Sequence, residues 1–197
     1  GLSLGFEKHG FKSLGYLDWD ECCIKSLKLN FNSKSKLFVH QDIRESIKNP
    51  NEDAENLINN SYNNLDGIIG GPPCQAYSLA GRIRDPNNMK NDYRNYLFES
   101  YIEWLVKTEP KFFVFENVTG MLSAKPDGPP IIDIITKAFK QINFDVPIIN
   151  KSIIFNLADF GGSQNRRRVI IFGVNKHKVK NSLEIIKTFY NNLSSQI

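Results

Sequence analysis

Three short polar motifs carry side chains that could act together on one substrate. The first is Pro73-Cys74-Gln75, in which a proline fixes the backbone before a thiol. The second, Glu116-Asn117-Val118, follows an apolar run, and the third, Gln164-Asn165-Arg166-Arg167-Arg168, precedes another. A thiolate is a nucleophile, a carboxyl group can donate or share a proton, and a guanidinium can hydrogen-bond a developing negative charge. Each motif alone has an ordinary structural interpretation, but the three in this order predict an enzyme site.

Apolar runs of strand length adjoin these motifs. The runs that predict strands are 36–39, 65–69, 111–115 and 169–174. Helical periodicity marks 95–109, which Pro110 ends, and 131–141. Strands that alternate with helices predict an α/β domain with a mostly parallel sheet, in which ligands bind at the carboxyl ends of the strands. Cys74 and Glu116 each follow such an end.

Composition narrows the class of protein without naming a substrate. The length of 197 residues suits one domain, and the 41% apolar content is ordinary for a soluble globular protein. A net charge of +4 permits nucleic acid binding but does not establish it. Three cysteines, two of them adjacent, argue against a disulfide framework and for a reducing compartment, which is the cytoplasm of a prokaryote or the nucleus of a eukaryote. No Cys/His spacing is typical of a zinc site.

Taken together, the three motifs resemble those of the DNA cytosine-5 methyltransferases, and the resemblance covers nearly all of residues 1–174. It implies a Rossmann-like, S-adenosylmethionine-dependent methyltransferase domain that acts on duplex DNA. By this resemblance Cys74 is the nucleophile that attacks carbon 6 of a flipped cytosine. Glu116 acts near ring nitrogen 3, and Arg166 and Arg168 hydrogen-bond the ring oxygen or a neighbouring phosphate. A base inside a duplex must be flipped out to reach such a pocket.

The resemblance also implies that S-adenosylmethionine is the methyl donor, with no metal. Six positions match the cofactor-contacting residues of the family: Asp18, Trp19, Asp42, Ile43, Pro73 and Leu97. Asp18 would accept hydrogen bonds from the ribose hydroxyls, Trp19 would stack on adenine, and Asp42 would accept from the adenine amino group. The alternative roles are helix or turn capping for the two carboxylates and plain packing for Trp19, Pro73 and Leu97.

Some parts of the family pattern are different or absent. Ser163 stands where the family usually has proline, and the first strand, the target-recognition region and the last two motifs do not occur in the chain. We therefore expect a catalytic domain over 1–174 and a helical extension over 175–197 that leads towards an absent target-recognition region. The expected partner is the missing part of the same enzyme or a complementary subunit, and no membrane is expected. The polar composition of 76–94 predicts a mobile loop that closes over a substrate backbone.

Three other functions remain open from the sequence. A transfer-RNA cytosine-5 methyltransferase resembles the same family, although Gln164 favours DNA. A non-catalytic fragment that only binds a partner chain is the second. The Gly-x-Ser-x-Gly pattern of residues 1–5 is typical of serine hydrolases, but that motif needs a preceding strand, and 6–10 continues as a helix instead.

Overall fold

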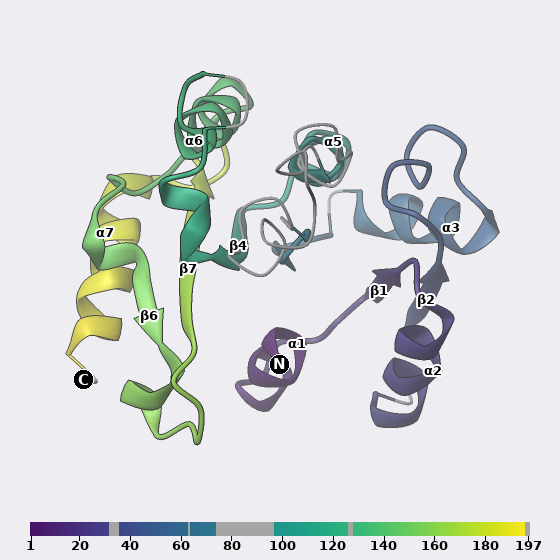
Figure 1. The fold of residues 1–197 in the computed structure, drawn as a ribbon. Coiled ribbons are helices and arrows are strands. Elements are labelled where there is room, and N and C mark those ends of the chain that lie inside the picture. The colour runs from purple at the N-terminus through teal and green to yellow at the C-terminus, as the bar shows by residue number, and fades with distance from the viewer. Residues whose placement is uncertain (32–35, 63, 74–96, 126–127, 196–197) are drawn as a thin grey trace. The chain divides into compact units, whose positions relative to one another are not determined.

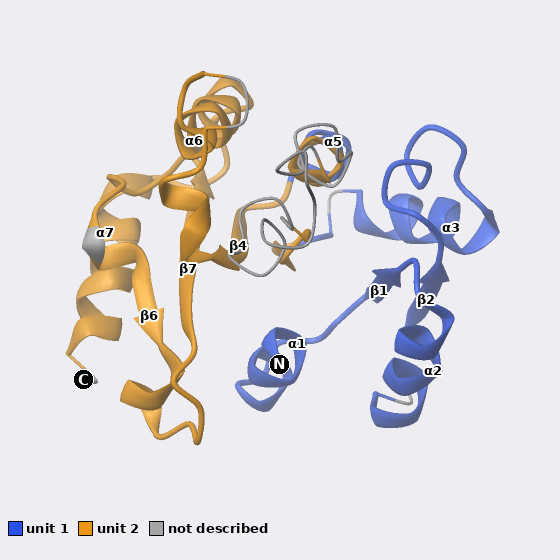
Figure 2. Ribbon diagram, in the orientation of Figure 1, with its two compact units in different colours: residues 1–65, 103–109 blue, residues 66–102, 110–197 orange. Residues whose placement is uncertain are grey.

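The structure, a computed structural model, describes residues 1–31, 36–62, 64–73, 97–125 and 128–195 (Figure 1). The chain divides into two compact units, which are residues 1–65 with 103–109 and residues 66–102 with 110–197 (Figure 2). Each unit has a sheet of its own. Among the described residues, no helix combines the length and the apolar character that crossing a membrane requires.

The first unit is built on two short parallel strands. Its elements are α1 (Leu2–Lys8), β1 (Gly15–Asp18), α2 (Glu21–Asn30), β2 (Leu37–His40) and α3 (Glu52–Ser61). β1 and β2 pair in register, so Asp18 lies opposite His40 at their carboxyl ends. The carboxylate of Asp20 caps α2 by accepting from the backbone N–H of Cys22 at 2.7 Å. β1 was not among the strands predicted from apolar runs, whereas β2 was predicted to within one residue.

A hydrogen-bonded cluster joins α1 to β1 and to Lys36, the residue before β2. The Glu7 carboxylate accepts from the Tyr16 hydroxyl at 2.6 Å and pairs with Lys36 Nζ at 2.6 Å. Burial raises the pKa of Glu7, but hydrogen bonds from Lys36, Ser13 and Tyr16 outweigh burial and lower that pKa to about 2. Burial, and then the hydrogen bond to Glu7, raises the pKa of Tyr16 to about 12. The cluster therefore holds Glu7 ionised and fixes α1 to the sheet.

The second unit is built on a larger sheet. Its elements are β3 (Gly67–Gly70), the first part of α5 (Leu97–Thr108), β4 (Phe112–Val118), α6 (Ile131–Gln141), β5 (Phe144–Asp145), β6 (Ile154–Asn156), β7 (Arg167–Asn175) and α7 (Ser182–Ser194). Short 3₁₀ turns occupy Thr119–Leu122, Lys151–Ile153 and Leu157–Phe160. The strand order is β3-β4-β7-β5, and β6 pairs with β7. The helix predicted over 131–141 is confirmed, and α5 lies within the helix predicted over 95–109.

The prediction of a mostly parallel sheet is wrong for this unit. β3 and β4 are parallel, but β7 runs antiparallel to β4, β5 and β6. The segment 157–166 that joins β6 to β7 is too short for a parallel crossover, which takes about a dozen residues or more and usually a helix, so the β6–β7 pair must be antiparallel. The fold is therefore α/β with a mixed sheet, and only partly of the expected Rossmann-like kind.

The antiparallel pairing also lengthens two strands beyond their apolar runs. β4 was predicted to end at Phe115 and β7 to begin at Val169. In the structure Glu116 pairs with Ile170, and Val118 pairs with Arg168. Glu116, Asn117 and Val118 therefore lie within β4, and Arg167 and Arg168 lie within β7, because each strand supplies the hydrogen-bonding partner that keeps the other extended. The first three residues of the arginine motif, 164–166, precede β7.

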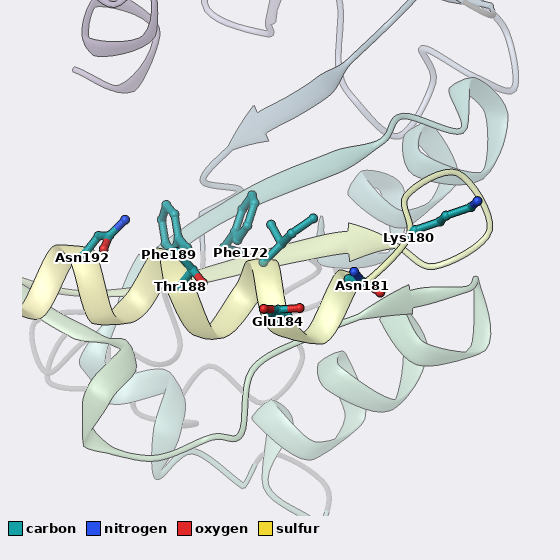
Figure 3. Close-up of a pocket in the computed structure, with 8 residues that line it drawn as sticks. Phe172, Lys180, Asn181, Glu184, Thr188, Phe189 and Asn192 are labelled. Carbon is teal, nitrogen blue, oxygen red and sulfur yellow. The ribbon is translucent and has the colours of Figure 1, made fainter.

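Helices cover both faces of this sheet. On one face Phe139 of α6 lies 4.3 Å from Phe113 of β4, measured between ring centroids. On the other face Phe189 of α7 stacks on Phe172 of β7 at 4.4 Å (Figure 3). The hydroxyl of Tyr190 accepts from the Phe172 N–H and donates to the carbonyl of Ile170, both at 2.9 Å. That hydroxyl therefore supplies hydrogen-bond partners for backbone groups of β7 that lie between the residues paired with β6 and those paired with β5.

Candidate active site

An arginine and a glutamate form an ion pair on the sheet of the second unit. Arg168 Nε lies 2.9 Å from Glu116 Oε1, and both side chains are about three-quarters buried, with 23% and 26% of their surface exposed. Glu116 faces Ile170 across the ladder, so Arg168, two residues earlier on β7, is its diagonal neighbour on the same face. The guanidinium is held further by a hydrogen bond from Arg168 Nη1 to the carbonyl of Arg167 at 2.8 Å. The pair offers a hydrogen-bond acceptor and a donor side by side.

The direction of β7 is what creates this pair. Arg168 lies near the start of β7 and Glu116 near the end of β4, so the two ends coincide only if the strands run antiparallel. In a parallel pairing the start of β7 would lie at the start of β4, about 13 Å or more along the strand from Glu116 at roughly 3.3 Å per residue. The antiparallel direction of β7 therefore both contradicts the predicted parallel sheet and brings Arg168 to Glu116.

The backbone that leads to Cys74 lies against the same stretch of β4. A Cβ atom added at Gly71 would be 2.7 Å from Glu116 Oε2 and 3.0 Å from the Glu116 carbonyl oxygen. The side chain of Asn117 donates from Nδ2 to the carbonyl of Pro72 at 3.1 Å. Glu116 and Asn117 thus contact the two residues that precede Pro73. Cys74 itself, and the loop predicted over 76–94, lie outside the described residues.

Arg166 occupies a different environment from Arg168. It lies just before β7, with its side chain exposed, and its carbonyl accepts from the backbone N–H of Leu157 at 3.0 Å. The structure therefore brings Glu116 and Arg168 together. Arg166 is close to Arg168 in the sequence, but its side chain is exposed.

Two of the predicted cofactor positions lie at one edge of the sheet in the first unit. Asp18 ends β1, and Asp42 follows the end of the neighbouring strand β2 by two residues. Asp18 Oδ1 accepts from the Asp20 N–H at 2.9 Å. Asp42 accepts from the backbone N–H of Arg44 at 2.9 Å and pairs with Arg44 Nη2 at 2.6 Å. These hydrogen bonds from Arg44 lower the pKa of Asp42.

The neighbours of these two carboxylates differ in exposure. The indole of Trp19 is 71% exposed, so Trp19 is not a core residue of its unit. Ile43 is half-buried, and its carbonyl accepts from the hydroxyl of Ser46 at 2.8 Å. Two carboxylates and an exposed aromatic ring at the carboxyl ends of parallel strands are groups that fit a nucleoside.

The other two predicted cofactor positions belong to the second unit. Pro73 is exposed after β3, and Leu97 is 7% exposed at the start of α5, so Leu97 packs into the core. Sequence reasoning did not select Asn117 or Gly71. The signal for Asn117 was present, because alternation along β4 puts this polar residue on the same face as Phe113 and Phe115, which are fully buried.

A pocket in the second unit lies beside α7. It has a volume of about 490 Å³ and is lined by Phe172, Lys180, Asn181, Glu184, Ile185, Thr188, Phe189 and Asn192 (Figure 3). None of the predicted site residues that the structure describes lines it. Across the described ranges, no group of three or more His, Cys, Asp or Glu side chains is placed to hold a metal ion.

Comparison with known proteins identifies the class to which this fold belongs. The structure matches the crystal structure of the Dnmt2 methyltransferase of S. pombe with a TM-score of 0.59 over 96% of this chain and 50% of that one, at 16% identity. At that identity the match shows the fold alone. This chain therefore shares the mixed α/β fold of that methyltransferase.

Sequence comparison gives the family. The family model for C-5 cytosine-specific DNA methylases matches residues 1–196, so this chain belongs to that family. The chain is 37% identical to the type II methyltransferase M.FnuDI of Fusobacterium nucleatum over 89% of its length and 44% of the relative. It is 33% identical to the type II methyltransferase M.DdeI of Desulfomicrobium norvegicum over 100% of its length and 45% of the relative. It spans about half the length of the curated relatives that it matches.

Proposed function

We propose that this chain carries the catalytic residues of an enzyme that transfers a methyl group from S-adenosylmethionine to carbon 5 of cytosine in duplex DNA. The observation that carries the proposal is the Glu116–Arg168 pair, joined at 2.9 Å beside the segment that leads to Cys74. Membership of the C-5 cytosine-specific DNA methylase family supports the same reaction.

Cys74 is the proposed nucleophile. Carbon 5 of cytosine is a poor nucleophile until a thiolate adds at carbon 6, because that addition converts the ring into an enamine-like species. The S–C6 bond forms first, and carbon 5 would then take the methyl group as the donor's S–CH₃ bond breaks and S-adenosylhomocysteine leaves. Loss of the carbon-5 proton to a base is followed by cleavage of the S–C6 bond, which restores the aromatic ring and releases Cys74.

Glu116 and Arg168 suit the polar edge of a cytosine. The carboxyl group of Glu116 shares or donates a proton at ring nitrogen 3, where charge develops as the thiolate adds. The guanidinium of Arg168 donates to the ring oxygen and cannot itself lose its proton. Their direct contact keeps the acceptor and the donor at a fixed spacing. Arg166, whose side chain is exposed, is proposed to contact the ring oxygen or a neighbouring phosphate.

We propose that S-adenosylmethionine binds at the six positions named from the sequence. With S-adenosylmethionine bound, its activated methyl group is the electrophile for carbon 5. Asp18 would accept from ribose hydroxyls and Asp42 from the adenine amino group, while the exposed ring of Trp19 would stack on adenine. Ile43, Pro73 and Leu97 would supply apolar contact.

Duplex DNA is the proposed substrate partner, and the part of the protein that reads the target sequence is proposed to lie in another segment or subunit. We further propose that 1–174 form the catalytic domain and that 175–197 extend from it, with α7 packed against β7.

The test is methyl transfer from labelled S-adenosylmethionine by the full-length protein to duplex DNA, and separately to transfer RNA. We expect labelled 5-methylcytosine in the DNA and its loss in the Cys74→Ala variant. Full activity of Cys74→Ala would refute the assignment of the nucleophile. Methylation of transfer RNA but not of DNA would refute DNA as the substrate and favour transfer RNA.

A further inference from the structure

Asn117 makes a buried hydrogen bond that the proposed chemistry does not use. Only 5% of its surface is exposed, and it follows Glu116 on β4. Its Nδ2 donates to the carbonyl of Pro72 at 3.1 Å, and its Oδ1 accepts from the backbone N–H of Val118 at 2.8 Å. Both ends of the carboxamide are therefore engaged, and the side chain has one fixed orientation.

The segment that Asn117 contacts lies beyond the end of the backbone ladder. The parallel ladder between β3 and β4 ends at the pair Gly70 and Phe115. Beyond Gly70 come Gly71 and then two prolines, which have no backbone N–H to donate to β4. The Pro72 carbonyl can still accept a hydrogen bond, and it accepts one from a side chain. The carboxamide of Asn117 supplies that donor where the backbone ladder stops.

Adjacent residues of β4 therefore hold this segment at two points. Glu116 lies against Gly71 so closely that a Cβ atom there would be 2.7 Å from its carboxylate oxygen. Asn117 holds the next residue, Pro72, by its carbonyl. Successive side chains on a strand point to opposite faces, so the two contacts approach the segment from different sides and oppose its displacement in either direction.

We infer that Asn117 is a positioning residue that sets the backbone two residues before Cys74 and thereby the direction from which the thiolate attacks. The inference rests on the proposed function for its effect on rate, although the contact itself does not. A misplacement of about 1 Å at a reacting group can cost roughly 100-fold in rate. Loss of the Asn117 donor should therefore slow methyl transfer without weakening cofactor binding.

The test compares two substitutions of Asn117 with a control in the same unit. Asn117→Asp keeps the shape of the side chain but removes the donor, and Asn117→Ala serves if the buried carboxylate prevents folding. Thr136→Val is the matched control, because the Thr136 hydroxyl is also buried and donates to a backbone carbonyl, that of Ile132 in α6. We measure the single-turnover rate of methyl transfer, the dissociation constant for S-adenosylmethionine, and amide hydrogen exchange of the peptide that contains Gly70 and Gly71.

We expect both Asn117 variants to slow methyl transfer by about 10- to 100-fold, with cofactor affinity near that of wild type and exchange faster at Gly70 and Gly71. Thr136→Val should leave the rate of methyl transfer, the cofactor affinity and the exchange at Gly70 and Gly71 unchanged. Unchanged exchange in the Asn117 variants would overturn the inference, as would faster exchange with an unchanged rate or an equal loss of cofactor affinity. If wild type methylates no cytosine, the proposed function fails, and hydrogen exchange alone then decides the role of Asn117.

Discussion

Gly71 is the position at which one added methyl group should disturb the site most directly. In Gly71→Ala the new Cβ atom would lie 2.7 Å from Glu116 Oε2 and 3.0 Å from the Glu116 carbonyl oxygen. The first contact can be relieved by turning the carboxylate away, but Glu116 would then lose Arg168, which it meets at 2.9 Å. The second contact involves the backbone of β4, which the ladder to β7 holds in place.

The expected cost follows from those two contacts. Overpacking by one methyl group costs about 1–3 kcal/mol. Gly71 is itself exposed, but its added Cβ atom would point at the backbone of β4. For a domain of this size each kcal/mol lowers the melting temperature by about 2–4 °C. We therefore expect Gly71→Ala to melt about 2–12 °C below wild type. Methyl transfer should fall by about 10- to 100-fold, because the carboxylate and the segment before Cys74 are both displaced.

Thermal melts and single-turnover methyl transfer measure these effects. Gly5→Ala is the matched control for stability, because a Cβ atom at Gly5 meets nothing within 4 Å and the residue lies inside α1. That change should stabilise the chain by about 0.5–1 kcal/mol. A Gly71→Ala protein with the melting temperature and the rate of wild type would refute the contact between Gly71 and Glu116.

Three further predictions concern the supporting structure. The pKa of Glu7 is lowered from 4.5 to about 2, so its stabilising contribution is complete above pH 4.5 and is lost as the pH falls towards 2. Urea unfolding at several pH values should show a weaker acid dependence in Glu7→Gln, and identical curves would contradict this. Tyr190→Phe leaves the Phe172 N–H without its acceptor and should cost about 1–3 kcal/mol in urea unfolding, whereas no loss would argue against the bridge at the edge of β7. Ser46→Ala removes the acceptor of the buried Trp104 indole N–H, 2.8 Å away, and should cost a similar amount, with a shift in tryptophan emission; unchanged emission would place that indole elsewhere.

The sequence predicted the helices and the buried strands better than their pairing. The helix over 131–141 was predictable because its apolar residues recur with helical period and Pro130 precedes it. β1 was missed because its four residues, Gly15–Asp18, show neither a long apolar run nor a clear alternation. The direction of β7 depends on its partners and on the length of the connection before it, which periodicity does not report.

For the candidate site, the structure shows which of the named residues lie together and leaves their roles as predictions. Glu116 and Arg168 were named from their motifs, and the structure joins them, although through an antiparallel pairing that was not expected. Asn117 was named as part of its motif but given no role, because a polar residue after an apolar run is typical of the end of a strand. Its role emerges only when the strand is seen to continue and Pro72 is seen beside it.

The most direct test of the account is covalent capture of Cys74 on a cytosine ring. Duplex DNA that carries 5-fluorocytosine in place of cytosine cannot lose the carbon-5 substituent as a proton, so the S–C6 bond should persist after methyl transfer. With the full-length protein and S-adenosylmethionine, we predict a denaturation-resistant complex whose cross-linked peptide contains Cys74. Methylation of ordinary cytosine DNA without such a complex, or with a complex at another residue, would contradict the account.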